Sequence, residues 1–171
     1  AANMLKNDLT PLQQTLVDGA IHGSGPLSEV LASSGSDNVL RGSMQRLKPK
    51  AWLNDEVVNY FVNFCLASRD KNMHNDNTNH RRSHFFNSFF VQTLFNEKNG
   101  NANEKGKYKY PNVKRWHKHA PGKNIFEQER IFFPISINNS HWELVVAFMD
   151  EKRIQYYDSL KWNGTKYLKG I

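Results

Sequence analysis

One stretch near the end of the chain limits the possible folds more than any other. Residues 144–149 form an apolar run, a charged turn follows at residues 150–152, and residues 154–157 are again rich in strand-forming side chains. Two such runs around a short polar turn predict an antiparallel β-hairpin. His141 opens the first strand and Asp158 closes the second, so the hairpin brings both to the same sheet edge.

An imidazole beside a carboxylate has two interpretations. The carboxylate fixes the tautomer of the ring and stabilises the imidazolium, which leaves the other nitrogen free to act as a general base. The same pair is also common as a purely structural hydrogen bond. The spacing alone leaves both interpretations open.

Size and charge narrow the class of protein. The chain has 171 residues, one domain's worth, and no apolar stretch approaches the roughly 18 residues that a membrane span needs. The single cysteine, Cys65, excludes an intrachain disulfide framework and fits a reducing, intracellular compartment. The net charge of +7 favours an acidic partner or a solvated basic face, but no groove-reading motif favours nucleic acid.

The N-terminal half reads as helical. Thr10-Pro11 is a start signal for a helix within residues 5–21. Residues 27–32 are predicted as a helical turn or an extended arm, residues 33–36 as a loop, residues 39–41 as a short strand, and residues 43–47 as a helical turn or two. Asn54 and Asp55 cap the strongest helix, whose predicted buried stripe is Val57, Tyr60, Phe61, Phe64 and Cys65. Cys65 is therefore expected to be a core side chain.

The remaining segments alternate between polar loops and apolar elements. Residues 68–84 are predicted as a surface loop, and the spacing of His74, His80 and His84 there matches no metal-ligand pattern. Residues 85–95 and 111–118 are predicted helices, and residues 96–107 a polar loop between them. Residues 131–137 are a predicted strand with an edge or bulge at Pro134, and another helix starts after residue 164. Helices followed by strands indicate an α+β fold.

Six motifs occur in an order that resembles the Ulp/sentrin-specific protease family, the cysteine proteases that process the ubiquitin-like modifier SUMO. They are Trp52-Leu53-Asn54-Asp55-Glu56, Phe86-Asn87-Ser88-Phe89-Phe90, Val113-Lys114-Arg115-Trp116, Pro134-Ile135, His141-Trp142 and Tyr157-Asp158-Ser159-Leu160. The resemblance implies a papain-like α+β fold formed by one domain over residues 1–171. It also implies SUMO or SUMO-conjugated proteins as partners, no cofactor or metal, no membrane, and a place in the nucleus or cytoplasm.

The resemblance assigns roles to five residues. His141 is the expected general base and Asp158 its orienting partner. Trp142 and Trp52 would wall a channel that admits only the Gly-Gly tail of the modifier, because two flat indoles exclude larger residues. Asp55 would pair with an arginine of the modifier, a role compatible with capping its helix.

The nucleophile is the departure from the family pattern. The family places its cysteine in an Asp-Cys-Gly motif after the aspartate, whereas Cys65 precedes His141. The expectation is therefore that this chain is the N-terminal part of the catalytic domain, that a C-terminal remainder carries the cysteine, and that the fragment alone is inactive. Three other functions stay open: an inactive module that binds the modifier, an acyltransferase with the same constellation, and a nucleic-acid binder, which ranks last.

Overall fold

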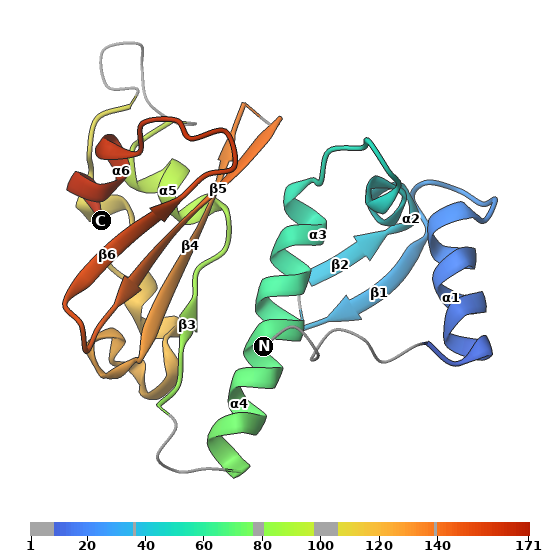
Figure 1. Ribbon diagram of the computed structural model, residues 1–171, viewed down its shortest axis with the longest axis horizontal. Helices are drawn as coiled ribbons and strands as arrows, with labels where there is room; N and C mark the ends of the chain where they lie inside the picture. Colours follow the sequence, from blue (N-terminus) through green and yellow to red (C-terminus); the bar gives the residue numbers. More distant parts are fainter. Residues whose placement is uncertain (1–8, 36, 77–80, 98–105, 139) are drawn as a thin grey trace. The chain divides into compact units, whose positions relative to one another are not determined.

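The computed structural model describes residues 9–35, 37–76, 81–97, 106–138 and 140–171. The chain divides into two compact units, Ala1–Val57 and Val58–Ile171. Figure 1 traces both units from the N-terminus to the C-terminus. None of the described helices combines the length and the apolar character that crossing a membrane requires.

The first unit contains helices around a two-stranded sheet. Its elements are α1 (Pro11–His22), β1 (Val30–Ser34), β2 (Asp37–Leu40), α2 (Arg41–Met44), the 3-10 helix η1 (Gln45–Leu47) and the start of α3 (Asp55–Tyr60). The second unit begins within α3 and continues with the π-helix η2 (Phe61–Leu66), α4 (Ala67–Asp76), β3 (His84–Phe85) and α5 (Phe89–Leu94). It then adds the four 3-10 helices η3 (Tyr110–Asn112), η4 (Trp116–His119), η5 (Pro121–Lys123) and η6 (Ile125–Glu127). The last elements are the strands β4 (Arg130–Ile137), β5 (His141–Phe148) and β6 (Arg153–Tyr157) and the helix α6 (Thr165–Gly170).

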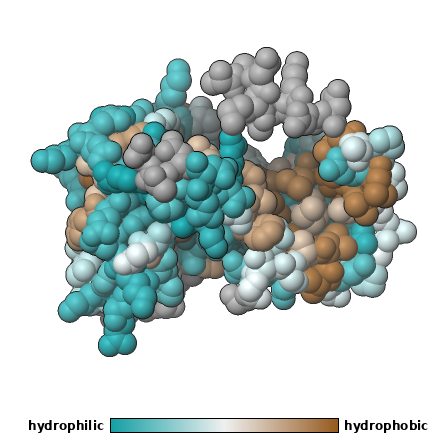
Figure 2. All heavy atoms as spheres, turned by 90° about the horizontal axis from the view of Figure 1, so that it is seen from below, coloured by the Kyte–Doolittle hydropathy of each residue, from teal (hydrophilic) through white to brown (hydrophobic). Residues whose placement is uncertain are grey.

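The predicted start of the first helix is confirmed. Thr10 is the N-cap of α1, and a capping box joins its side chain to Gln13, whose backbone N–H lies 3.3 Å from Thr10 Oγ1. The apolar residues of this helix do not enter a core, because Leu12 and Leu16 are 70% and 64% exposed. Figure 2 shows apolar side chains, in brown, at the surface of the first unit.

The segment after α1 is more extended than the sequence indicates. Residues 30–34 form strand β1, so an extended arm was the better of the two predictions for this region, and the loop predicted at residues 33–36 was wrong for Ser33 and Ser34. Pairing supplies the reason: β1 runs antiparallel to β2, and Ser33 Oγ lies 2.8 Å from Asn38 Oδ1 across the ladder. Residue 36 is outside the described residues. The strand predicted at 39–41 and the turns at 43–47 correspond to β2, α2 and η1.

The cap of the long helix was predicted correctly, but its buried stripe was not. Val57 N–H donates to Asn54 Oδ1 at 3.2 Å. Phe61, Phe64 and Cys65 are exposed, so Cys65 is not a core side chain.

The buried face of this helix is largely polar. Asn59, Val62 and Asp70 are the buried positions, and both polar side chains bind backbone N–H groups of the following segment. Asn59 Oδ1 accepts from Ser88 at 2.8 Å, and Asp70 accepts from Ser83 at 3.0 Å. Those two hydrogen bonds select which face of the helix turns inward.

The loop predicted for residues 68–84 was wrong at both ends. α4 continues the helix to Asp76, and His84 pairs with Ile131 as the first residue of β3, where it is buried. Asp70 holds this segment in place, because Arg82 Nε donates to its Oδ2 at 2.7 Å. A polar composition therefore concealed a helix and a strand that side-chain hydrogen bonds stabilise. Residues 77–80, including His80, are outside the described residues.

The second unit is organised by a mixed four-stranded sheet in the order β3-β4-β5-β6. β3 runs parallel to β4, and the other neighbours are antiparallel. The predicted hairpin is β5–β6, with Phe148 opposite Arg153 at its turn. Pro134 lies in β4 beyond Phe132, where the pairing with β3 ends, so the edge expected at the proline is present locally.

One face of this sheet carries the core. The alternating residues Ile131, Phe133 and Ile135 of β4 pair with Ala147, Val145 and Glu143 of β5 and share that face. Phe90 and Leu94 of α5 pack on it, so residues 89–94 form the predicted helix, but Phe85 belongs to a strand.

Short 3-10 helices replace the helix predicted for residues 111–118, and α6 starts near residue 164 as expected. Val113 is buried and Trp116 packs against the core, as expected for the inward side of the predicted helix. Of the predicted loop at 96–107, residues 98–105 are outside the described residues. Helices beside a sheet with antiparallel strands confirm the α+β prediction.

Candidate active site

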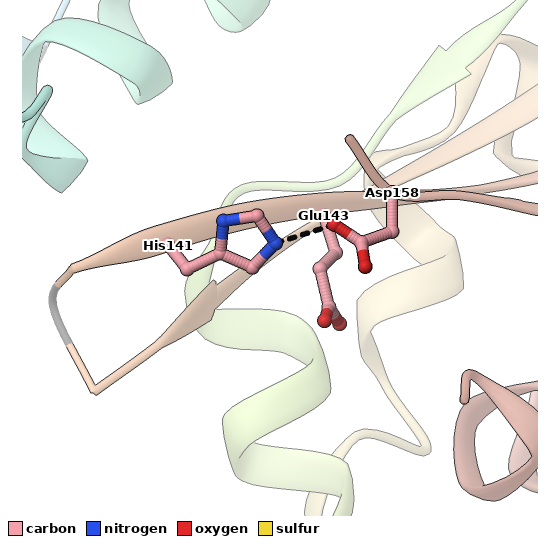
Figure 3. Close-up of side chains that lie close together, drawn as sticks. All are labelled: His141, Glu143 and Asp158. Atoms are coloured by element: carbon pink, nitrogen blue, oxygen red, sulfur yellow. Dashed lines mark hydrogen bonds and ion pairs between the residues drawn. The ribbon is translucent and has the colours of Figure 1, made fainter. Parts of the chain in front are cut away.

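The structure brings together the two residues that the hairpin predicts to meet. His141 Nε2 lies 2.5 Å from Asp158 Oδ1, and both side chains are nearly inaccessible to solvent, at 6% and 1% exposure. Figure 3 shows the imidazole at the start of β5 pointing toward the carboxylate that follows β6. The contact uses Nε2, so Nδ1 takes no part in it. The predicted contact is therefore present, and the catalytic roles of the pair stay predictions.

The sheet register explains why the contact forms. The ladder between β5 and β6 pairs Leu144 with Tyr157, so the next residue of the chain, Asp158, comes level with Glu143. Side chains alternate along a strand, which puts His141 and Glu143 on the core face together. His141 pairs with Ile137 at the last position of the β4–β5 ladder, where this face reaches the sheet margin.

Backbone groups hold Asp158 as a carboxylate. Burial alone would raise its pKa, but the N–H groups of Trp162 and Leu160 donate to it at 2.6 Å and 3.0 Å, and His141 adds a further hydrogen bond. Together these contacts outweigh burial and hold the pKa of Asp158 below its usual value. Because backbone N–H groups hold the Asp158 carboxylate in place, its hydrogen bond gives the imidazole of His141 one orientation.

Two neighbours of this pair were missed in the sequence. The ring of Trp162 lies 4.9 Å from that of His141, centroid to centroid, while its N–H binds Asp158. Its only signal was an indole four residues after the aspartate, within reach of the same turn. Glu143 is buried beside the pair, and its signal was the His-x-Glu spacing, which puts both side chains on one face of a strand.

The other predicted site residues are distributed over the two units. Trp142 lies on the opposite face of β5 from His141 and is half-buried, and it lines an open hollow of ≈ 420 Å³ together with Leu144, Tyr157 and Ser159. Trp52 is 56% exposed and Asp55 lies in the first turn of α3, both in the first unit. Their substrate-binding roles stay predictions.

Comparison with known proteins gives a consistent result. Residues 51–169 match the Ulp1 protease family, C-terminal catalytic domain. Sentrin-specific protease 2 of Homo sapiens is 36% identical over 157 residues, which are 92% of this chain and 23% of that protein. Ubiquitin-like-specific protease 1A of Arabidopsis thaliana is 33% identical over 147 residues, which are 84% of this chain and 27% of that protein.

Solved structures extend the likeness to the fold. The C-terminal Ulp1 protease domain in complex with Smt3, the yeast ortholog of SUMO, superposes with a TM-score of 0.70 at 25% identity, and the match covers 97% of this chain and 65% of that one. Ulp1 with its catalytic cysteine oxidised to a sulfenic acid gives a TM-score of 0.68 at 26% identity. The chain spans about a quarter of the length of the curated relatives. On the extent of these matches, the chain belongs to the Ulp1 protease family.

Proposed function

We propose that this chain forms part of a cysteine protease that cleaves after the Gly-Gly tail of SUMO, acting as isopeptidase and C-terminal hydrolase. The observation that carries the proposal is the 2.5 Å contact between His141 and Asp158 in a chain of this family. The relatives support the substrate class, since they carry the names sentrin-specific and ubiquitin-like-specific protease. A related Ulp1 domain has been solved with Smt3 bound.

In the proposal, each nitrogen of the imidazole has a distinct task. Asp158 accepts a hydrogen bond from the N–H at Nε2 and so fixes the tautomer, which leaves Nδ1 with a lone pair for a thiol proton. The resulting thiolate attacks the carbonyl carbon of the terminal glycine, and the carbonyl oxygen takes the negative charge. The C–N bond then breaks as the imidazolium gives its proton to the leaving lysine amine, and the modifier stays bound to the sulfur as a thioester. Water attacks the thioester with His141 as general base, which releases the modifier and restores the thiol.

We propose that the nucleophilic thiol belongs to polypeptide outside residues 1–171. Cys65 is exposed on η2, and no hydrogen bond joins it to His141 among the described residues. A thiol that passes its proton to an imidazole must come within hydrogen-bond distance of it, and its reactivity depends on that electropositive setting.

Recognition of the modifier follows from the tryptophans and the first turn of α3. In the proposal, the flat ring of Trp142 excludes branched side chains beside the Gly-Gly tail, and Trp52 keeps the substrate-binding role that the resemblance implies. Asp55 offers a carboxylate to an arginine of the modifier. A bulkier residue in the tail of the modifier therefore tests the tryptophans, whereas a change of its arginine tests Asp55.

The deciding experiment measures hydrolysis of a fluorogenic SUMO C-terminal substrate by the full-length protein. His141→Ala is expected to lower kcat by about 10³-fold or more, and Asp158→Asn by about 10²-fold or more, because the first lacks the base and the second lacks its orienting partner. His119→Ala and Asp150→Asn change exposed residues elsewhere in the chain and serve as matched controls.

Three outcomes separate the alternatives. Loss of turnover in both site variants, with KM little changed and both controls active, supports the proposal. Tight SUMO binding without turnover by the unaltered full-length protein would refute catalysis and leave a modifier-binding module. Unchanged turnover in His141→Ala would remove the imidazole from the mechanism.

A further inference from the structure

Three potential metal ligands lie together: the proposed catalytic pair and a buried glutamate next to it. His141 and Glu143 are two residues apart on one face of β5, and Asp158 comes level with them at the end of β6 (Figure 3). One nitrogen or oxygen from each of the three side chains lies within 4.8 Å of the other two. A His-x-Glu pair on one strand with a carboxylate on the next is therefore assembled by the sheet register alone.

Glu143 is the member that the proposed mechanism does not use. It is 6% exposed, and its Oε2 is buried without a hydrogen-bond partner in the described part of the chain. No ion pair to Lys or Arg reaches it there. The Tyr156 hydroxyl interacts with Glu143, and its pKa is raised first by burial and then by this carboxylate. Exposed acidic clusters are common without an ion, but a buried carboxylate without a counter-charge is costly, and a cation removes that cost.

We infer that His141, Glu143 and Asp158 form a binding site for a zinc ion. One imidazole nitrogen and two carboxylate oxygens belong to the ligand set that zinc takes in proteins, with water in the fourth position. When both carboxylates are ionised, a doubly charged cation neutralises the cluster.

Zinc binding and the His–Asp hydrogen bond exclude each other. Zinc–ligand bonds of about 2.0–2.2 Å at tetrahedral angles put ligand atoms roughly 3.3 Å apart. Nε2 and Oδ1 are 2.5 Å apart, so their side chains must separate by about 1 Å to admit the ion. The zinc ion then binds His141 Nε2, the atom that is otherwise hydrogen-bonded to Asp158. Zinc is thus a reversible inhibitor, and this consequence, unlike the binding itself, rests on the proposed function.

The test measures binding directly. Full-length protein whose thiols have been alkylated with iodoacetamide competes with a chromophoric chelator for Zn²⁺. Glu143→Gln keeps the size of the side chain and removes one charged ligand, and Glu151→Gln removes an exposed carboxylate from the β5–β6 turn as the matched control. We expect Glu143→Gln to raise the Kd for Zn²⁺ at least 10-fold and Glu151→Gln to leave it unchanged. Equal affinities in the two variants, or no zinc bound by the unaltered protein, would overturn the inference.

Two further readouts keep the inference testable if Glu143→Gln fails to fold. Co²⁺ added to the unaltered alkylated protein should give the visible bands of a four-coordinate nitrogen and oxygen site, and their absence would overturn the inference. With active protein that is not alkylated, Zn²⁺ should inhibit SUMO hydrolysis, and the half-inhibiting concentration should rise in Glu143→Gln relative to the variant's own rate. If no hydrolysis is found at all, the proposed function fails while the binding result stands.

Discussion

His84 offers a quantitative test of the packing in the second unit. It is the first residue of β3, it is buried at 6% exposure, and its Nε2 has no hydrogen-bond partner in the described residues. Its ring meets the edge of Phe86 at 4.4 Å between centroids, and it lines a cavity of ≈ 440 Å³ that His119 also lines. Burial, and then the charge of His119, lowers the pKa of His84 to about 4.

The sign of the effect follows from the two states of the chain. An unfolded histidine has a pKa of about 6.5. Between pH 6.5 and about 4, His84 is therefore protonated in the unfolded chain and neutral in the folded chain. Stability is therefore complete above pH 6.5 and is lost as the pH falls toward 4. The interval of about 2.5 pH units at about 1.4 kcal/mol per unit gives a maximum loss of about 3.5 kcal/mol.

The assay is urea unfolding of the full-length protein at several pH values from 7 to 4.5, compared with His84→Gln. The substitution costs packing at every pH, but its free energy of unfolding should fall less steeply on acidification, so the gap to the unaltered protein narrows by about 2–3 kcal/mol. His119→Gln removes the neighbouring charge and should raise the pKa of His84 only slightly. Equal pH slopes for the unaltered protein and His84→Gln would refute the reasoning, as would an NMR titration that places the pKa of His84 near 6.5.

Two more perturbations test contacts that position the sheet. Asp70→Asn leaves Arg82 without its carboxylate and weakens the acceptor for Ser83 N–H, so the free energy of unfolding should fall by about 2–4 kcal/mol in urea titrations, whereas Asp76→Asn at the end of α4 should change it by less than about 0.5 kcal/mol. Gly164→Ala places a Cβ against the ring of Tyr156 and should lower the melting temperature, with a cost of about 1–3 kcal/mol, whereas Gly19→Ala in α1 meets open space and should be neutral or stabilising. Equal melting temperatures for the two alanine variants would contradict the close packing at residue 164.

The hairpin was predictable because its determinants are local. Strand-forming runs on either side of Asp150, Glu151 and Lys152 fix the turn, and the turn fixes the register. Once the register is set, His141 and Asp158 meet without any further information from the rest of the chain. The same local logic identified Thr10 and Asn54 as helix caps.

The long helix was not predictable in the same way. An apolar spacing of three and four residues favoured burial of Phe61 and Phe64, yet the π-helical segment η2 changes the angular position of every residue after Tyr60. Asn59 and Asp70 face inward because Ser88 and Ser83 offer them N–H groups from 29 and 13 positions away. A periodicity of apolar side chains carries no information about such long-range polar partners.

The candidate site was predictable in its pair and not in its surroundings. The order of a histidine and an aspartate along a hairpin is visible in sequence, but the turn after Asp158 folds back through two backbone N–H groups, and this turn brings Trp162 to the imidazole. Backbone donors leave no trace in residue types. The ionised state of Asp158 therefore follows only from the structure.

Two carboxylates a few ångströms apart thus have opposite environments. Asp158 receives two backbone N–H groups and the imidazole, so its charge is compensated by donors that are fixed in the fold. Glu143, which lies level with it on β5, has a buried oxygen with no hydrogen-bond donor in the described part of the chain and lies beside Ile135 and Tyr156. Environments that differ this much imply different tasks. A carboxylate with fixed donors suits permanent orientation of an imidazole, whereas one that lacks a counter-charge suits a ligand that comes and goes.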